Sequence, residues 1–97
     1  MIIYIDIDNT ICKTQDVSDY SKSTPISENI EKVKALVSEG HEVSFWTARG
    51  SLSGKDWKEL TLNQLDSWGV GGIPVIFGKP YFDLFIDDRV MNVEDWK

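Results

Sequence analysis

Four short segments rich in apolar residues punctuate the chain, at residues 1–5, 42–47, 73–77 and 82–86. Each is shorter than a typical helix and contains β-branched or aromatic side chains, which favours a β-strand. The first segment is apolar without a break, a pattern typical of a strand buried on both faces of a parallel sheet. Pro74 lies near the start of the third segment and predicts an edge position for that strand.

Two stretches between these segments have the spacing of amphipathic helices. Apolar residues recur three and four positions apart after Ser27, which we expect to be the N-cap, and Gly40 suits the C-terminal cap. A second helix is expected over residues 56–68. The order strand, helix, strand, helix, strand, strand predicts an α/β domain with a mainly parallel sheet of about four strands and helices covering its faces.

Composition and charge limit the possible partners. The 97 residues suffice for a single domain, residues 1–97, and 41% hydrophobic residues indicate a globular chain. The net charge of −6 argues against a nucleic-acid backbone or an anionic membrane as the main partner. No run approaches the roughly 20 apolar residues of a membrane span. Because Cys12 is the only cysteine, no internal disulfide can form, and we expect a cytoplasmic location.

Each predicted strand is followed by polar residues suited to binding or catalysis. These residues are Asp6, Asp8 and Thr10 after the first strand, Thr47 and Arg49 after the second, Lys79 after the third, and Asp87 and Asp88 after the fourth. Ligands of parallel α/β sheets bind beyond the carboxyl ends of the strands, so we expect these side chains to converge.

Asp6 and Asp8 are two positions apart, so they leave an extended strand side by side unless the backbone bends between them. Two adjacent carboxylates repel each other, and a metal ion or a shared proton relieves the repulsion. For this pair alone, a solvated strand end with two surface acids is an equally good interpretation. The acids and cations that follow the other strands favour a functional site.

The four strand ends together resemble the motifs of the haloacid dehalogenase (HAD) superfamily of phosphatases and phosphotransferases. These motifs are Asp6-Ile7-Asp8-Asn9-Thr10, the Thr47 that ends the second strand, Lys79, and Asp87-Asp88 with Asn92 four residues beyond. All four occur in the order of the family and span nearly the whole chain. The resemblance implies a Rossmann-like three-layer sandwich of a minimal type without a cap domain. Residues 11–26 then form a flap over the active site.

The resemblance also implies a role for each residue. Asp6 is the nucleophile that forms an aspartyl-phosphate, and Asp8 is the general acid and base. Thr47 hydrogen-bonds a phosphate oxygen, and Lys79 stabilises charge on the transferring phosphoryl group. An acid two positions after the nucleophile is characteristic of the phosphatases and phosphomutases of the family, which favours hydrolysis of phosphate esters.

Magnesium is the expected cofactor, since it prefers oxygen ligands and is commonly held by one or two carboxylates together with water and phosphate. The resemblance makes Asp6 and the backbone carbonyl of Asp8 two of its ligands. Asp88 is the expected direct third ligand, and Asp87 is the neighbour that supports it.

The substrate is less well defined by the sequence. Asn9, Thr10 and Arg49 are the candidate substrate-binding residues. Arg49 could bind a second anionic group or form a structural salt bridge, and Thr10 also suits bracing of the loop. The acidic charge favours a small phosphorylated metabolite such as a sugar phosphate. The alternatives are a polynucleotide or other macromolecular phosphatase, a phosphotransferase, and a non-catalytic binding module of the same fold. The oligomeric state leaves no signal in the sequence.

Overall fold

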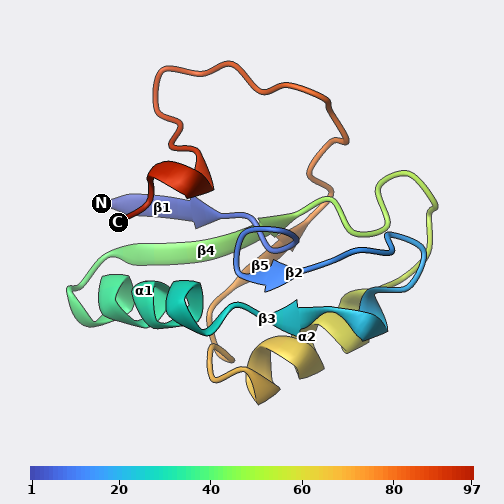
Figure 1. Ribbon diagram of the computed structural model, residues 1–97, viewed down its shortest axis with the longest axis horizontal. Coiled ribbons are helices and arrows are strands. Elements are labelled where there is room, and N and C mark those ends of the chain that lie inside the picture. The colour runs from blue at the N-terminus through green and yellow to red at the C-terminus, as the bar shows by residue number, and fades with distance from the viewer.

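Three parallel strands form the main sheet of the computed structural model, which describes residues 1–97. They are β1 (Ile2–Ile5), β4 (Glu42–Thr47) and β5 (Val75–Phe77), in the order β1-β4-β5 (Figure 1). β4 is therefore the central strand, and its bounds confirm the prediction for residues 42–47. β5 lies at an edge, as Pro74 predicts. The mainly parallel α/β architecture is confirmed.

Both helices, α1 (Ser27–Ser38) and α2 (Lys58–Ser67), pack on the same face of this sheet. Figure 1 shows them together on one side of β4. They contribute to one cluster of buried apolar side chains. Its members are Ile5, Ile7, Ile11, Cys12, Ile30, Val33, Val43, Phe45, Leu65 and Val70. Because side chains alternate along a strand, the core receives every second residue of β1 and β4.

The opposite face of the sheet is open, which corrects the expectation of three layers. Ile2 and Tyr4 of β1 are 71% and 59% exposed, and Ile76 of β5 is 41% exposed. β1 is therefore buried on one face, not on both as its unbroken apolar run predicts. The physical reason is that no helix crosses to this side: α1 and α2 both direct their buried residues to the single core.

The sheet has three strands where about four are expected, because residues 82–86 are not a strand. They belong to residues 80–92, a segment we call the arch, in which every residue is exposed. The chain leaves the sheet at β5, one of its two edge strands, and residues 82–86 pair neither with that edge nor with the free edge of β1. In Figure 1 the arch swings outward past β1 before the chain returns in the short helix η2 (Val93–Asp95). An apolar run without a partner strand forms no ladder of hydrogen bonds.

The predicted flap, residues 11–26, leaves the end of β1 and returns to α1. It contains the antiparallel pair β2 (Cys12–Lys13) and β3 (Thr24–Pro25), with the short helix η1 (Tyr20–Lys22) at its turn.

α1 begins one residue earlier than its predicted cap allows. Ser27 is the first helical residue, and Ile26 occupies the N-cap position without a side-chain hydrogen bond. The side-chain amide of Asn29 instead donates to the carbonyl oxygen of Thr10 at 2.8 Å, so the start of the helix is tied to the loop after β1. None of the helices combines the length and apolar character needed to cross a lipid bilayer.

Candidate active site at the strand ends

The backbone bends between Asp6 and Asp8, so these two acids have different partners. β1 ends at Ile5, and the carbonyl oxygen of Ile7 accepts hydrogen bonds from the amides of Thr10 and Ile11. Asn9 completes the turn with a φ of 60°, a left-handed conformation that asparagine tolerates better than most residues. The expected side-by-side arrangement is thereby replaced by two separate pairs, each joining one carboxylate to one cation.

Asp6 pairs with Lys79, which comes from the opposite edge of the sheet. The Nζ atom of Lys79 lies 3.4 Å from Oδ1 of Asp6, and the hydroxyl of Thr10 donates to Oδ2 at 3.2 Å. Burial raises the pKa of Asp6 above its ordinary value, and the charge of Lys79 opposes this rise. Asp6 and Lys79 are therefore brought together as the sequence predicts.

Two features hold Lys79 in place. Gly78 turns the chain with a φ of 91°, a conformation that L side chains rarely adopt, and the amide of Lys79 then donates to the carbonyl oxygen of Thr47 at 3.1 Å. The ammonium group lies 5.5 Å from the ring centre of Trp46 and 5.3 Å from that of Phe82. Aromatic faces attract cations at this distance.

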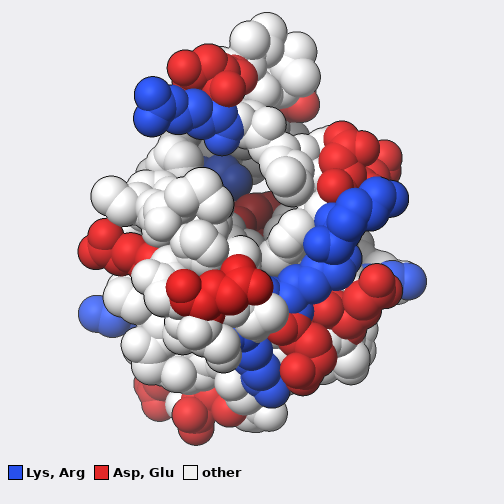
Figure 2. Space-filling model, turned by 90° about the vertical axis from the view of Figure 1, so that its left-hand side faces the viewer, with Lys and Arg blue, Asp and Glu red and all other residues white.

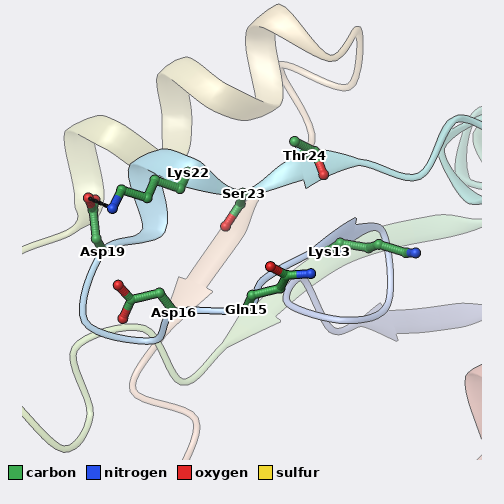
Figure 3. Close-up of a pocket in the computed structure, with 7 residues that line it drawn as sticks. All are labelled: Lys13, Gln15, Asp16, Asp19, Lys22, Ser23 and Thr24. Carbon is green, nitrogen blue, oxygen red and sulfur yellow. Dashed lines mark ion pairs between the residues drawn. The ribbon is translucent and has the colours of Figure 1, made fainter.

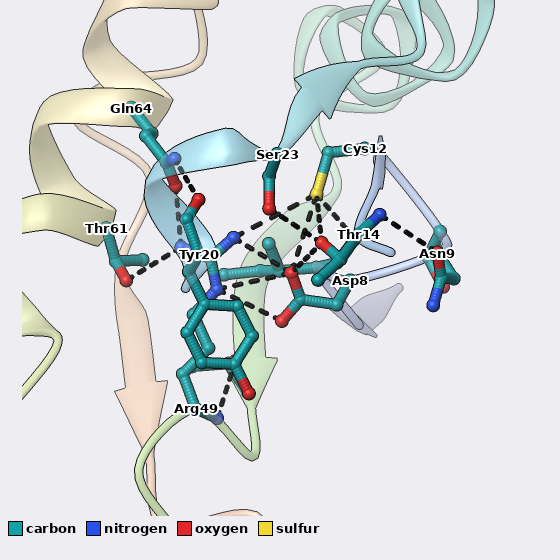
Figure 4. Close-up of polar contacts among 12 residues, drawn as sticks. Asp8, Asn9, Cys12, Thr14, Tyr20, Ser23, Arg49, Thr61 and Gln64 are labelled. Atoms are coloured by element: carbon teal, nitrogen blue, oxygen red, sulfur yellow. Dashed lines mark hydrogen bonds and ion pairs between the residues drawn. The ribbon is translucent and has the colours of Figure 1, made fainter. Parts of the chain in front are cut away.

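Asp8 pairs with Arg49, whose side chain is completely buried. Nη2 of Arg49 lies 2.8 Å from Oδ1 of Asp8, and Nε lies 3.0 Å from Oδ2, so the guanidinium grips both carboxylate oxygens (Figure 4). The hydroxyl of Thr14 also donates to Oδ1, at 2.6 Å. Charge-assisted pairs with two parallel hydrogen bonds are among the strongest in proteins.

The remaining donors of Arg49 are also occupied. Nη1 donates to Oγ1 of Thr61 at 3.0 Å and to Oε1 of Gln64 at 2.6 Å, both on α2. The ring of Tyr20 covers the guanidinium at 4.6 Å. Arg49 thus makes a structural ion pair in this conformation, and its binding of a second anionic group of the substrate stays a prediction.

Thr47, Asn9 and Thr10 have mainly internal roles in this structure. Thr47 is fully buried, and its hydroxyl accepts from the amide of Arg49 at 3.1 Å. Asn9 is exposed, and its side-chain oxygen accepts from the amide of Thr14 at 3.0 Å. Thr10 braces the loop through Asp6. Contacts of these three residues with a substrate stay predictions.

Asp87 and Asp88 lie in the exposed arch and do not join the other acids. They interact with each other: their hydrogen bonding raises the pKa of Asp88 and lowers that of Asp87. Nε of Arg89 lies 3.7 Å from Oδ2 of Asp88. Nowhere do three histidine, cysteine, aspartate or glutamate side chains come close enough to hold a metal ion. In this conformation the donor set expected for magnesium does not fit, because Asp6 and Asp8 each face a cation and the third carboxylate is elsewhere.

Four residues of the site escape sequence analysis: Thr14, Tyr20, Thr61 and Gln64. Thr61 carried a usable signal, because it shares a helix face with Leu65 four residues on and a polar group at a core position needs a partner. Tyr20 lies in an irregular loop, where no periodicity indicates which side chains point inward.

The flap and the arch each border a hollow at the surface. One, of about 250 Å³, is lined by seven residues of the flap itself, none of them hydrophobic (Figure 3). Its lining carries both signs of charge, from Lys13, Lys22, Asp16 and Asp19, and contains none of the predicted site residues. The other is the space under the arch, where Figure 2 shows a basic and an acidic side chain at the floor of a cleft between the arch and the body.

Comparison with known proteins gives a likeness of fold alone. No family model matches the chain, and no curated protein matches it. The structure is similar to the crystal structure of a structural-genomics target from Vibrio cholerae, with a TM-score of 0.85 and 24% sequence identity over 97% of this chain and 85% of that one. The same fold therefore occurs in another protein, and membership of the HAD superfamily stays a prediction.

Proposed function

We propose that this protein is a phosphate monoester hydrolase of the HAD type that acts through an aspartyl-phosphate on Asp6. The observation that carries the proposal is the pair formed by Asp6 and Lys79 at 3.4 Å, which joins the ends of β1 and β5 across the central strand. A carboxylate nucleophile needs a neighbouring cation to bind and neutralise an incoming phosphate. Asp8, two residues away, supplies the second carboxyl group that phosphate transfer and hydrolysis require.

In the first step a carboxylate oxygen of Asp6 attacks phosphorus, and the bond between phosphorus and the ester oxygen breaks. The leaving oxygen takes the proton of the Asp8 carboxyl group and departs as an alcohol. Lys79 stabilises the negative charge on the phosphoryl oxygens during the transfer. The products of this step are the alcohol, the aspartyl-phosphate and the Asp8 carboxylate.

In the second step a water molecule attacks the phosphorus of the aspartyl-phosphate and gives a proton to the Asp8 carboxylate. The bond between phosphorus and Asp6 breaks, which releases inorganic phosphate and restores both side chains. Because the strand ends are open beneath the arch, water reaches the intermediate, and this access favours hydrolysis over transfer to a second alcohol.

The magnesium requirement and the fourth strand belong to the same proposal. In the proposed active form, residues 82–86 pair with the free edge of β1, which has only one neighbouring strand. Asp87 and Asp88 would then follow a strand end next to Asp6, where the predicted ligand set is complete. The apolar character of residues 82–86 and the exposure of the arch support this movement, because docking would bury side chains that now face water.

The net charge of −6 supports a small phosphorylated metabolite such as a sugar phosphate as the substrate, rather than a polynucleotide. The free thiol of Cys12 is consistent with a cytoplasmic protein.

The test is hydrolysis of p-nitrophenyl phosphate with added magnesium and with a chelator. We expect turnover that requires magnesium and is abolished in Asp6→Asn. Asp66→Asn, an exposed site on α2, is the matched control and should retain full activity. A wild-type protein that turns over no phosphate ester in magnesium contradicts the proposal and favours a binding module.

A further inference from the structure

The two oxygens of the Asp8 carboxylate have unequal surroundings. Oδ1 accepts from Nη2 of Arg49 at 2.8 Å and from the hydroxyl of Thr14 at 2.6 Å, and the thiol of Cys12 lies 3.6 Å away. Oδ2 accepts only from Nε of Arg49, at 3.0 Å. A carboxylate oxygen has about two lone-pair sites, so Oδ1 is saturated while Oδ2 keeps one site free.

Arg49 is fixed in turn by two segments that lie far from it in the sequence. Thr61 and Gln64 on α2 accept from Nη1, and the ring of Tyr20 in the flap lies over the guanidinium. Figure 4 shows Thr61, Gln64 and Tyr20 gathered around Arg49. We call Tyr20, Thr61 and Gln64 the clamp.

The clamp also closes the flap onto α2. The side-chain amide of Gln64 donates to the carbonyl oxygen of Tyr20 at 2.7 Å. The Tyr20 ring meets the ring of Trp57 edge to face at 5.1 Å, in the geometry that aromatic pairs prefer. The position of the flap and the position of Arg49 are therefore determined by the same contacts.

We propose that the clamp residues are positioning residues for Asp8: they hold Arg49, and Arg49 holds the Asp8 carboxyl group so that Oδ2 alone is free to exchange a proton with the leaving oxygen. This inference rests on the proposed function and assigns a task to residues that the reaction steps do not use. The ring of Tyr20 is the central part, because it keeps water from the ion pair and thereby keeps the carboxyl group in one orientation.

Two substrates whose leaving groups differ in their need for a proton distinguish positioning of Asp8 from a purely structural role of the clamp. Nitrophenolate departs with little help from an acid, whereas the alkoxide of an alkyl phosphate needs a well-placed proton. In Tyr20→Leu we expect turnover of glycerol 2-phosphate to fall about tenfold more than turnover of p-nitrophenyl phosphate, because misorientation of a catalytic group costs rate where its proton is needed. Tyr20→Phe keeps the ring and should preserve the wild-type ratio of the two rates.

Thr61→Val and Gln64→Leu each remove one acceptor of Arg49. Each should lower the ratio of glycerol 2-phosphate turnover to p-nitrophenyl phosphate turnover, by less than Tyr20→Leu does. Asn63→Ala, an exposed neighbour on α2, should leave it unchanged. Equal losses on both substrates in Tyr20→Leu, or a ratio lowered in Tyr20→Phe as well, would overturn the inference.

A measurement that does not depend on activity completes the test. The Nε proton of Arg49 is buried and hydrogen-bonded, so it should give a slowly exchanging signal in nitrogen-15 NMR spectra of the wild type and of Tyr20→Phe, but not of Tyr20→Leu. Loss of the signal only in Tyr20→Leu supports the clamp, and an unchanged signal in that variant refutes it. An inactive wild type with an intact signal refutes the proposed function and the catalytic role of the clamp.

Discussion

The pair of Asp8 and Arg49 and the acids of the arch are predicted to belong to one site, yet they have opposite surroundings. Arg49 is buried and bonded to groups from the first loop and α2, and the flap covers it. Asp87 and Asp88 lie in a segment that is exposed throughout and has no regular element. The difference shows what positions a functional side chain. A residue close to the end of a paired strand is placed by the sheet, whereas a residue beyond an unpaired run is not.

A second contrast lies within the first motif. Asp6 faces the open side of the strand ends with Lys79 as its cation, and its side chain is 37% exposed. Asp8, two residues later, lies beneath the flap with Arg49 and is 20% exposed. The turn at Asn9 separates two carboxylates that a straight strand would place together. Under the proposed function this separation suits their different tasks, since the nucleophile must meet the substrate while the acid needs a fixed orientation.

The largest effect is expected for Arg49→Ala, which removes the cation from the buried pair. The Asp8 carboxylate, which is only 20% exposed, would be left without its partner, and breaking a buried pair costs about 3–5 kcal/mol. We expect the free energy of unfolding in urea to fall by this amount. Arg89→Ala is the matched control: the Arg89–Asp88 pair is exposed on both sides, and its loss should change stability by less than about 0.5 kcal/mol. Similar losses in the free energy of unfolding for Arg49→Ala and Arg89→Ala would show that Arg49 is not buried in solution.

Next in size is the effect of Asp88→Asn on turnover, which tests whether the arch ever joins the site. If residues 82–86 dock on β1 in the active form, loss of this carboxylate should lower turnover of p-nitrophenyl phosphate about 100-fold. Asp83→Asn lies in the same arch and should have little effect, because no role is assigned to that side chain. Full activity of Asp88→Asn would leave the arch outside the active site and would remove the third ligand from the proposal.

The regular elements could largely be predicted from the sequence, and the pairing within the site could not. The bounds of β4 follow from a local pattern of alternating residues, and the centres of both helices follow from their periodicity. The contact between Asp8 and Arg49 depends on how the loop after β1 turns, which no periodicity encodes. Residues 82–86 have the composition of a strand, but a strand also needs a neighbour, and composition does not say whether one is available.

Asp6→Asn, measured with a chelator present, should raise the free energy of unfolding at pH 7. This change is smaller than the one expected for Arg49→Ala and has the opposite sign. Burial raises the pKa of Asp6, so the native state binds its proton more tightly than the unfolded state does. The ionised side chain therefore lowers stability at pH 7, and this penalty disappears as the pH falls through the raised pKa toward the ordinary value of 3.8. Asp6→Asn should be more stable than the wild type at pH 7 and indistinguishable from it below that value. A variant less stable at pH 7 would show that the attraction of Lys79 outweighs burial.

The smallest effect is expected for Leu84→Ala in the arch, and it is the most direct measure of how far the two regions differ. Leu84 is 75% exposed, so its truncation in a chelator should change the free energy of unfolding by less than about 0.5 kcal/mol. Leu65→Ala makes the same change at a side chain that is 2% exposed and should cost about 2–5 kcal/mol.

Adding magnesium and inorganic phosphate sharpens the comparison between these two leucines. Ligands that bind only the folded form stabilise it. If binding docks residues 82–86 on β1, the wild type should gain more stability than Leu84→Ala, whereas Leu65→Ala should gain as much as the wild type. A loss above about 1 kcal/mol for Leu84→Ala in the chelator would mean that the arch is already packed on the sheet before any ligand binds.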